Sequence, residues 1–200
     1  MFIMENTIKK EIHIEPLETE IIDIDIIGIT PLLMNRFSER QQELLKKYWE
    51  GLKGTRKKDI PTEKQIVEEA TYYNDDGKVC FPTSGFRRGI EEVAKDKMID
   101  IGFTGKAAKG SIRFLEPLTE INFKEMVINK SWGKVKKTPK LAIRPEFRDW
   151  SCKLKIAYNP RVVSTTSLLN LLNWAGSYCG LGDWRPSTSG TYGQYKVKTT

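Results

Sequence analysis

The sequence is poor in the side chains that many enzymes use for catalysis. Its 200 residues include one histidine, His13, and three cysteines, Cys80, Cys152 and Cys179. Histidine is the commonest general base and metal ligand, so we do not expect a histidine-dependent enzyme. The cysteines are too widely spaced for a CxxC metal motif and cannot all pair, which favours buried thiols in a reducing compartment. We expect no catalytic residues, no metal and no cofactor.

Long apolar runs are also missing. No stretch approaches the roughly 18–20 apolar residues of a membrane-spanning helix. Glutamates occupy the first residues, where a signal peptide would have its apolar segment. These features predict a cytoplasmic protein without a membrane partner. The length suits one hydrophobic core, so residues 1–200 are expected to form a single domain, with 1–19 as a leader or edge element.

Acidic side chains are scarce in the second half. Residues 1–100 carry 16 basic and 20 acidic side chains, whereas residues 101–200 carry 17 and 6, giving net charges of −4 and +11. An asymmetry of this size suggests a surface that faces a polyanion, either nucleic acid or an acidic protein.

Apolar spacing gives the order of elements. Alternation predicts strands over residues 20–30, 78–82, 111–118, 125–132, 141–147, 150–158 and 192–198. Capping residues and helical spacing predict helices that begin near residues 38, 62, 84 and 164. The composition of residues 104–111 predicts a loop. The mixed order predicts an α+β fold, a ferredoxin-like or RRM-like antiparallel sheet with helices and an inserted basic hairpin.

Residues 176–195 form a glycine-rich segment that also carries Trp184, Arg185 and Tyr192. Glycine lets a backbone approach a ligand closely, arginine binds phosphate through two hydrogen bonds, and aromatic rings stack on bases. The combination suits a nucleic-acid backbone. The alternative is structural, with the glycines ending a helix and Trp184 packing in the core.

Residues 133–140 predict the tip of a basic hairpin. The cations expected to contact phosphates there are Lys134, Lys136, Lys137, Lys140 and the nearby Arg144. The alternative is a solvated loop. Further candidates for the nucleic-acid-binding surface are Arg36 and the pair Arg87 and Arg88, each of which could instead form a surface ion pair.

One pair of carboxylates could hold a metal. Asp23 and Asp25 share a face of the first strand, and paired carboxylates can support metal-dependent cleavage. No further carboxylate or histidine pattern completes such a site, so a solvent-facing strand is favoured over a nuclease.

Three blocks of the sequence resemble a family of small bacteriophage proteins. The three blocks are GITPLLMNRF (28–37), the RPEFRDW segment (144–150) and the glycine-rich ending AGSYCGLGDWRPSTSGTYGQYKV (175–197). The resemblance implies a viral protein in the cytoplasm of the host cell.

More distantly, the glycine-rich block resembles the RAMP superfamily, whose backbone subunits in CRISPR effector complexes polymerise along guide RNA. This resemblance implies a modified RRM-like fold that holds RNA or single-stranded DNA on a basic face. The resulting hypothesis is an oligomeric, non-enzymatic protein that coats or organises single strands. The alternative is a protein-interaction module that inhibits a host nuclease or defence complex.

Overall fold

The computed structural model describes residues 18–50, 61–96, 105–135 and 138–199. The larger sheet has the strand order β10-β1-β9-β6-β4-β3, with β5 also paired to β9. Its strands are β1 (Glu20–Gly28), β3 (Tyr72–Tyr73), β4 (Val79–Pro82), β5 (Ile112–Phe114), β6 (Leu118–Asn122), β9 (Ser151–Tyr158) and β10 (Tyr195–Val197). All pairings in this sheet are antiparallel. The order of β10, β1, β9 and β5 is that of a ferredoxin-like core, which confirms the predicted fold class.

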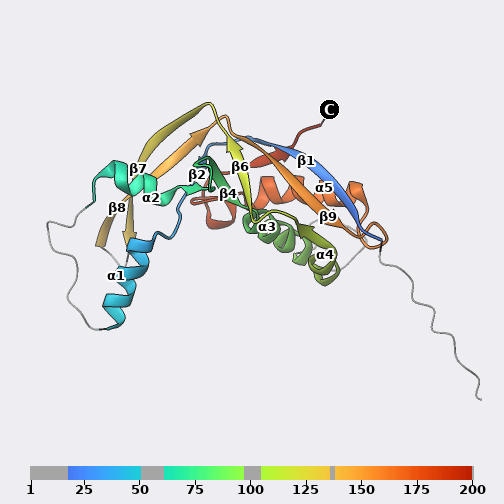
Figure 1. Ribbon diagram of the computed structural model, residues 1–200, viewed down its shortest axis with the longest axis horizontal. Helices are drawn as coiled ribbons and strands as arrows, with labels where there is room; N and C mark the ends of the chain where they lie inside the picture. The colour runs from blue at the N-terminus through green and yellow to red at the C-terminus, as the bar shows by residue number, and fades with distance from the viewer. Residues whose placement is uncertain (1–17, 51–60, 97–104, 136–137, 200) are drawn as a thin grey trace, which may run out of the picture.

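Alternation along β1 separates the core from solvent. Ile24 and Ile26 are buried, and Asp23 and Asp25, which alternate with them, point to the other face of the sheet. Helices α3 (Thr83–Lys95) and α5 (Thr165–Trp174) cover the inner face and contact each other. The centre of the core is formed by β9 together with Phe86 and Ile90 of α3 and Leu168, Leu171 and Leu172 of α5. Figure 1 shows these helices lying beneath the sheet.

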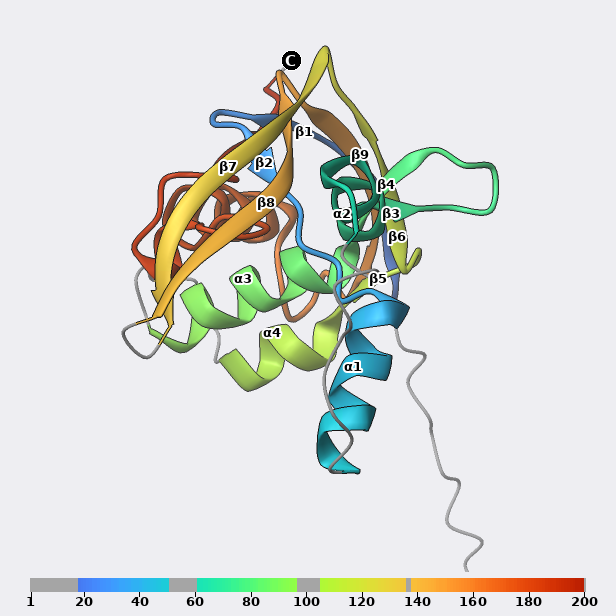
Figure 2. The ribbon, with the colours of Figure 1, turned by 90° about the vertical axis from the view of Figure 1, so that its left-hand side faces the viewer.

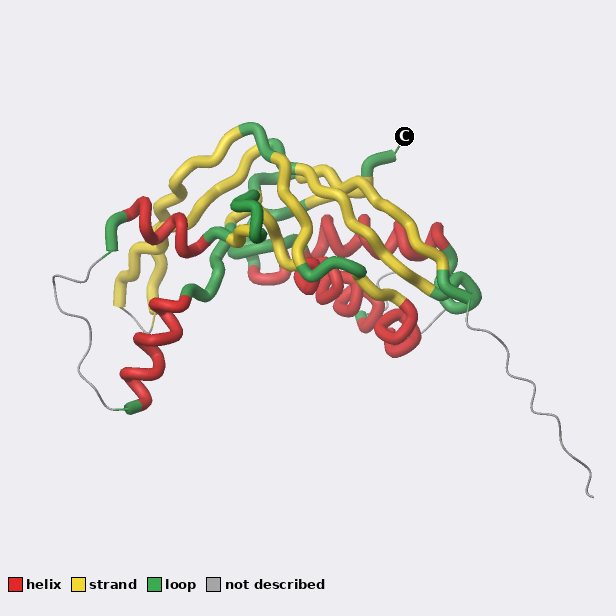
Figure 3. Tube along the Cα trace, in the orientation of Figure 1, coloured by secondary structure: helices red, strands yellow, loops and turns green. Residues whose placement is uncertain are grey.

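A second, three-stranded sheet is inserted into this core. Strands β7 (Glu125–Val135) and β8 (Thr138–Arg148) form a long antiparallel hairpin, and β2 (Leu32–Leu33) pairs with β8. Helix α2 (Glu63–Ala70) packs on β8. Helix α1 (Glu39–Trp49) extends from the same end of the molecule. In Figure 3 the strands follow the outer side of an arch, with the helices beneath it.

Two predicted helix starts carry complete capping boxes. The Gln65 backbone N–H donates to the Thr62 hydroxyl, and the Gln65 side chain accepts from the Thr62 N–H at 2.8 Å. Ser38 and Gln41 exchange the same two bonds before α1. Each pair satisfies two backbone donors that a helix end leaves open.

The expected loop over residues 104–111 is wrong, because residues 105–111 form helix α4 (Gly105–Ser111). This helix packs beside α3, as Figure 2 shows, and the carbonyl of Lys109 accepts a hydrogen bond from Arg87. Tertiary contact therefore overrides the low helix propensity of the two glycines.

The strand expected over 111–118 is also divided into two. It ends after Phe114, and β6 begins after Pro117, which has no N–H to continue a ladder. None of the described helices is long and apolar enough to cross a membrane.

Candidate nucleic-acid interface

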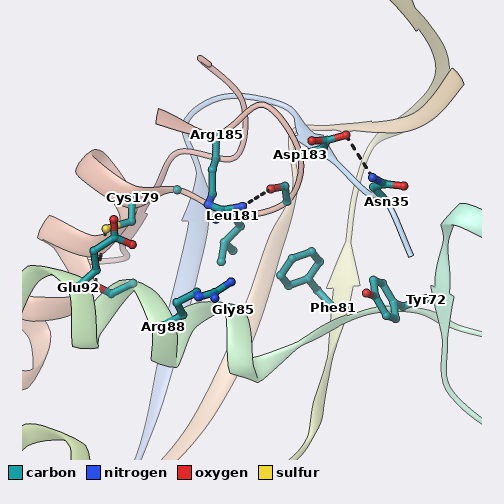
Figure 4. Close-up of a pocket in the computed structure, with 13 residues that line it drawn as sticks. Asn35, Tyr72, Phe81, Gly85, Arg88, Glu92, Cys179, Leu181, Asp183 and Arg185 are labelled. Carbon is teal, nitrogen blue, oxygen red and sulfur yellow. Dashed lines mark hydrogen bonds between the residues drawn. The ribbon is translucent and has the colours of Figure 1, made fainter. Parts of the chain in front are cut away.

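A cleft of about 370 Å³ opens between α3 and the glycine-rich segment (Figure 4). Five parts of the chain line it: the segment after β2, strands β3 and β4, the exposed side of α3, and the turns that follow α5. The lining residues are Asn35, Tyr72, Phe81, Gly85, Arg88, Gly89, Glu92, Cys179, Gly180, Leu181, Gly182, Asp183 and Arg185.

Helix α3 presents one face to the cleft. Gly85, Arg88, Gly89 and Glu92 fall at positions i, i+3, i+4 and i+7, which share a helix face. A Cβ added at Gly89 would lie 3.1 Å from the Cβ of Ala175. The glycines therefore let the backbone after α5 approach α3 closely, with the charged side chains at the cleft.

The glycine-rich segment begins with a turn of π-helix over Ala175–Cys179, closed by a hydrogen bond from the Gly180 N–H to the Ala175 carbonyl at 2.9 Å. Gly182 follows with a positive φ of 73°, which only glycine adopts readily. A Cβ at Gly182 would lie 2.1 Å from the Leu33 carbonyl oxygen. Gly180 and Gly182 thus end a helix and approach the protein's own backbone, in agreement with the structural alternative, and close approach to a ligand stays a prediction.

Two arginines supply positive charge to the cleft. The guanidinium of Arg185 donates to the Gly182 carbonyl at 3.0 Å and to the Ser187 hydroxyl at 2.9 Å, so its orientation is fixed (Figure 4). Arg88 is exposed and forms no ion pair with any residue of the described chain. It therefore lies on the cleft wall with its hydrogen-bond donors available.

The base of the hairpin is fastened to the glycine-rich segment by two polar networks. The Asp183 carboxylate accepts from Arg144 at 3.1 Å and from Asn35 at 3.4 Å. The buried Glu146 carboxylate accepts from Asn129 at 2.7 Å, and the Asn129 amide also donates to the Tyr192 hydroxyl at 3.2 Å. These contacts fix the position of the hairpin relative to the cleft.

The structure brings together only part of the predicted binding surface. Arg88 and Arg185 line the cleft, whereas Arg87 lies on another side of α3 in an ion pair with Glu91 at 3.0 Å. Arg36 is half-buried beside the cleft residue Asn35, and its backbone N–H bonds the Ala70 carbonyl.

The remaining predicted residues lie outside the cleft wall. Trp184 is 43% exposed, Arg144 is neutralised by Asp183, and Tyr192 is at the hairpin base. Lys134 lies opposite Pro139 in the hairpin ladder, and Lys140 lies opposite Gly133. Lys136 and Lys137 fall outside the described residues.

The sequence interpretation did not single out three polar residues that line the cleft, Glu92, Asn35 and Tyr72. A signal for Glu92 was present, because it follows Arg88 by four positions and must share its helix face. The exposure of Trp132 on β7, at 73%, was also missed.

The carboxylates considered for a nuclease face solvent. Asp23 and Asp25 lie directly opposite Lys155 and Lys153, and the Lys153 Nζ is 3.8 Å from the Asp25 Oδ1. Within the described ranges, no group of three or more His, Cys, Asp or Glu side chains is placed to hold a metal ion.

Cys179 lines the cleft but is not an activated thiol. Burial, together with the nearby Glu92 carboxylate, raises its pKa to about 11. A protonated thiol is a weak nucleophile, so the cleft does not contain a reactive cysteine at neutral pH.

The sequence matches no protein-family model and no curated protein. A solved structure does match: a chain of the Type III-B Cmr-beta bound to cognate target RNA superposes with a TM-score of 0.57 at 13% identity. The match covers 90% of this chain and 59% of that one, so the present chain spans less than two thirds of its length. Cmr6 from Pyrococcus furiosus gives a TM-score of 0.40 at 9% identity, covering 92% of this chain and 100% of that one. The first of these matches shows that this chain is similar in fold to the Cmr-beta chain.

Proposed function

We propose that the protein binds single-stranded nucleic acid, RNA or DNA, in the cleft between α3 and the glycine-rich segment. The observation that carries the proposal is that Arg88 and Arg185 both line the same concave surface. Guanidinium groups bind phosphate oxygens in a fixed geometry. Arg185 is already oriented by two hydrogen bonds, so it loses little freedom when it binds a strand.

The fold supports the same role. The matching chain belongs to a structure whose complex is bound to target RNA. The second half of the present sequence carries the positive excess of +11, and the cleft receives one of its two walls from that half. An excess of cations attracts a polyanion and raises its local concentration.

We further propose that copies of the protein coat a strand in a phage-infected host. Three exposed apolar side chains on one face of β7, Met126, Ile128 and Trp132, support contact between copies, with Lys130 between the last two. Exposed apolar side chains on an edge strand are a frequent feature of interaction surfaces.

The test is fluorescence anisotropy of labelled single-stranded RNA and DNA at several salt concentrations. An Arg88→Ala, Arg185→Ala variant is expected to bind at least about tenfold more weakly at low salt, because each charged hydrogen bond contributes about 1.5–3 kcal/mol. The slope of log K against log salt is expected to fall by about 1.4, since one phosphate contact on a single strand contributes about 0.7.

Arg113→Ala is the matched control. Arg113 is an exposed arginine on β5, opposite Ala157 and outside the cleft. Its loss should leave the affinity within about twofold and the slope nearly unchanged. If the wild-type protein binds neither strand at low salt, the proposal is wrong, and the cationic surface must instead serve a protein partner. Coating itself requires a footprint that lengthens with the strand.

A further inference from the structure

Glu92 has an unusual place for a carboxylate in a cleft that binds a polyanion. It is half-buried in the cleft wall, and no lysine or arginine of the described residues lies within 4 Å of its carboxylate. The other acid in the cleft, Asp183, is different because Arg144 neutralises it at 3.1 Å. The neighbour of Glu92 is the Cys179 thiol, as Figure 4 shows, and an uncharged thiol does not offset the negative charge, so Glu92 repels phosphate and suits a ligand group that donates hydrogen bonds.

A carboxylate accepts hydrogen bonds and donates none. Among the four bases, only guanine presents two adjacent donors, N1–H and the N2 amino group, on its Watson–Crick edge. Adenine and cytosine place an acceptor beside their amino group, and uracil and thymine present one N–H between two carbonyls. One carboxylate can accept both guanine donors at once, which selects guanine over the other bases.

The neighbours of Glu92 fit the rest of such a nucleotide. Arg88 precedes Glu92 by four residues on the same face of α3, which places their Cβ atoms about 5–6 Å apart. The guanidinium can bind the phosphate while the carboxylate binds the base. Phe81 and Tyr72 add apolar ring surface to the same cleft, and Figure 4 shows them across from the helix residues. The volume of about 370 Å³ lies within the range of small-molecule sites, about 300–1,000 Å³.

We propose that the cleft accepts one guanine nucleotide of a bound single strand, with Glu92 contacting the base edge and Arg88 its phosphate. This inference rests on the proposed function and adds a base preference to it. With such a site, the protein is expected to bind preferentially at guanines rather than uniformly along a strand.

The test compares uridine octamers that carry one central guanine, inosine or adenine with the all-uridine octamer. The guanine octamer is expected to bind at least about fivefold more tightly than the all-uridine strand, the low end of what one bidentate base contact supplies. Inosine keeps N1–H but lacks the N2 amino group, so its octamer should fall between the two. This comparison uses the wild-type chain and does not depend on any variant folding.

Glu92→Gln then identifies the residue. The variant should lose the guanine preference while its affinity for the all-uridine octamer stays the same or increases, because a repelling charge is removed. The control is Glu91→Gln, which alters the adjacent carboxylate, paired with Arg87 and Lys109 outside the cleft. It should keep the guanine preference.

Equal binding of all four octamers by the wild-type protein would overturn the inference and leave the proposed function intact. A guanine preference that survives in Glu92→Gln would also overturn it. If no octamer binds even at low salt, the proposed function fails, and the guanine site fails with it.

Discussion

Gly176 in the glycine-rich segment is tightly confined by neighbouring backbone, although its φ is not in the left-handed region. A Cβ there would lie 2.1 Å from the Tyr195 carbonyl oxygen in β10. Neither backbone can move without disturbing the sheet, so Gly176→Ala is expected to lower the free energy of unfolding by about 1–3 kcal/mol or more. Urea unfolding measures the change.

Gly110 provides the opposite case in the same experiment. A Cβ at this position in α4 meets no atom within 4 Å. Gly110→Ala should therefore raise the free energy of unfolding by about 0.5–1 kcal/mol, because alanine loses less backbone entropy in a helix. Equal effects of the two substitutions would contradict the close approach described for Gly176.

Two buried thiols make the stability depend on alkaline pH. Burial raises the pKa of Cys152 to about 12 and that of Cys179 to about 11, from an ordinary value of 9.0. Above pH 9 the unfolded chain releases these protons while the folded chain keeps them. Stability is thus fully present below pH 9 and is lost as the pH rises toward 11–12, by about 1.4 kcal/mol per pH unit for each thiol.

Urea midpoints at pH 8, 9.5 and 10.5 measure this loss. A Cys152→Ala, Cys179→Ala variant removes both titrating groups and is expected to lose stability less steeply over the same interval, from a lower starting value. Parallel curves for the two proteins would show that the thiols do not contribute.

At the scale of elements, the buried Glu146 on β8 stabilises the β7–β8 hairpin from within, because its partners lie on both strands. Its side chain is 7% exposed and accepts from Asn129 and from Arg148, the latter at 2.8 Å. Glu146→Ala leaves the Asn129 amide short of a partner and should cost about 1–3 kcal/mol of stability.

Glu125→Ala is the matched control, because Glu125 pairs with the same Arg148, at 3.3 Å, but is 57% exposed. Its loss should cost less than about 1 kcal/mol. Thermal unfolding of both variants gives the comparison, and a larger effect of Glu125→Ala would refute the stabilising role of the buried carboxylate.

The elements that sequence reasoning placed correctly are those with a local cause. The capping boxes at Ser38 and Thr62 involve residues three positions apart, and the alternation of β1 and β9 is visible in any short window. Helix α4 was missed because its formation depends on packing against α3. The π-helix before Gly180 was missed for a similar reason, since nothing in its local sequence distinguishes it from the end of α5.

At the scale of the whole molecule, the order of the predicted elements identified the α+β class, whereas the sequence predicted only part of the site. Arg185 was named because an arginine among glycines and aromatic rings suits a nucleic-acid backbone, and Arg88 was named as a further cationic candidate. The spacing of Glu92 from Arg88 is a local signal, but Asn35 belongs to the same cleft only because residues far apart in the sequence fold together, and no local pattern carries that information. The electrostatic prediction thus identified two of the cations but not the concave surface between them.

The central claim is that a single strand lies in the cleft between α3 and the glycine-rich segment. Photocrosslinking of the intact protein to a 4-thiouridine oligonucleotide, followed by mass spectrometry of the adducts, tests binding and its location together. We expect adducts on peptides that contain residues 83–95 and 175–195, reduced in the Arg88→Ala, Arg185→Ala variant. Adducts confined to the outer face of the large sheet, or none at low salt, would contradict the claim.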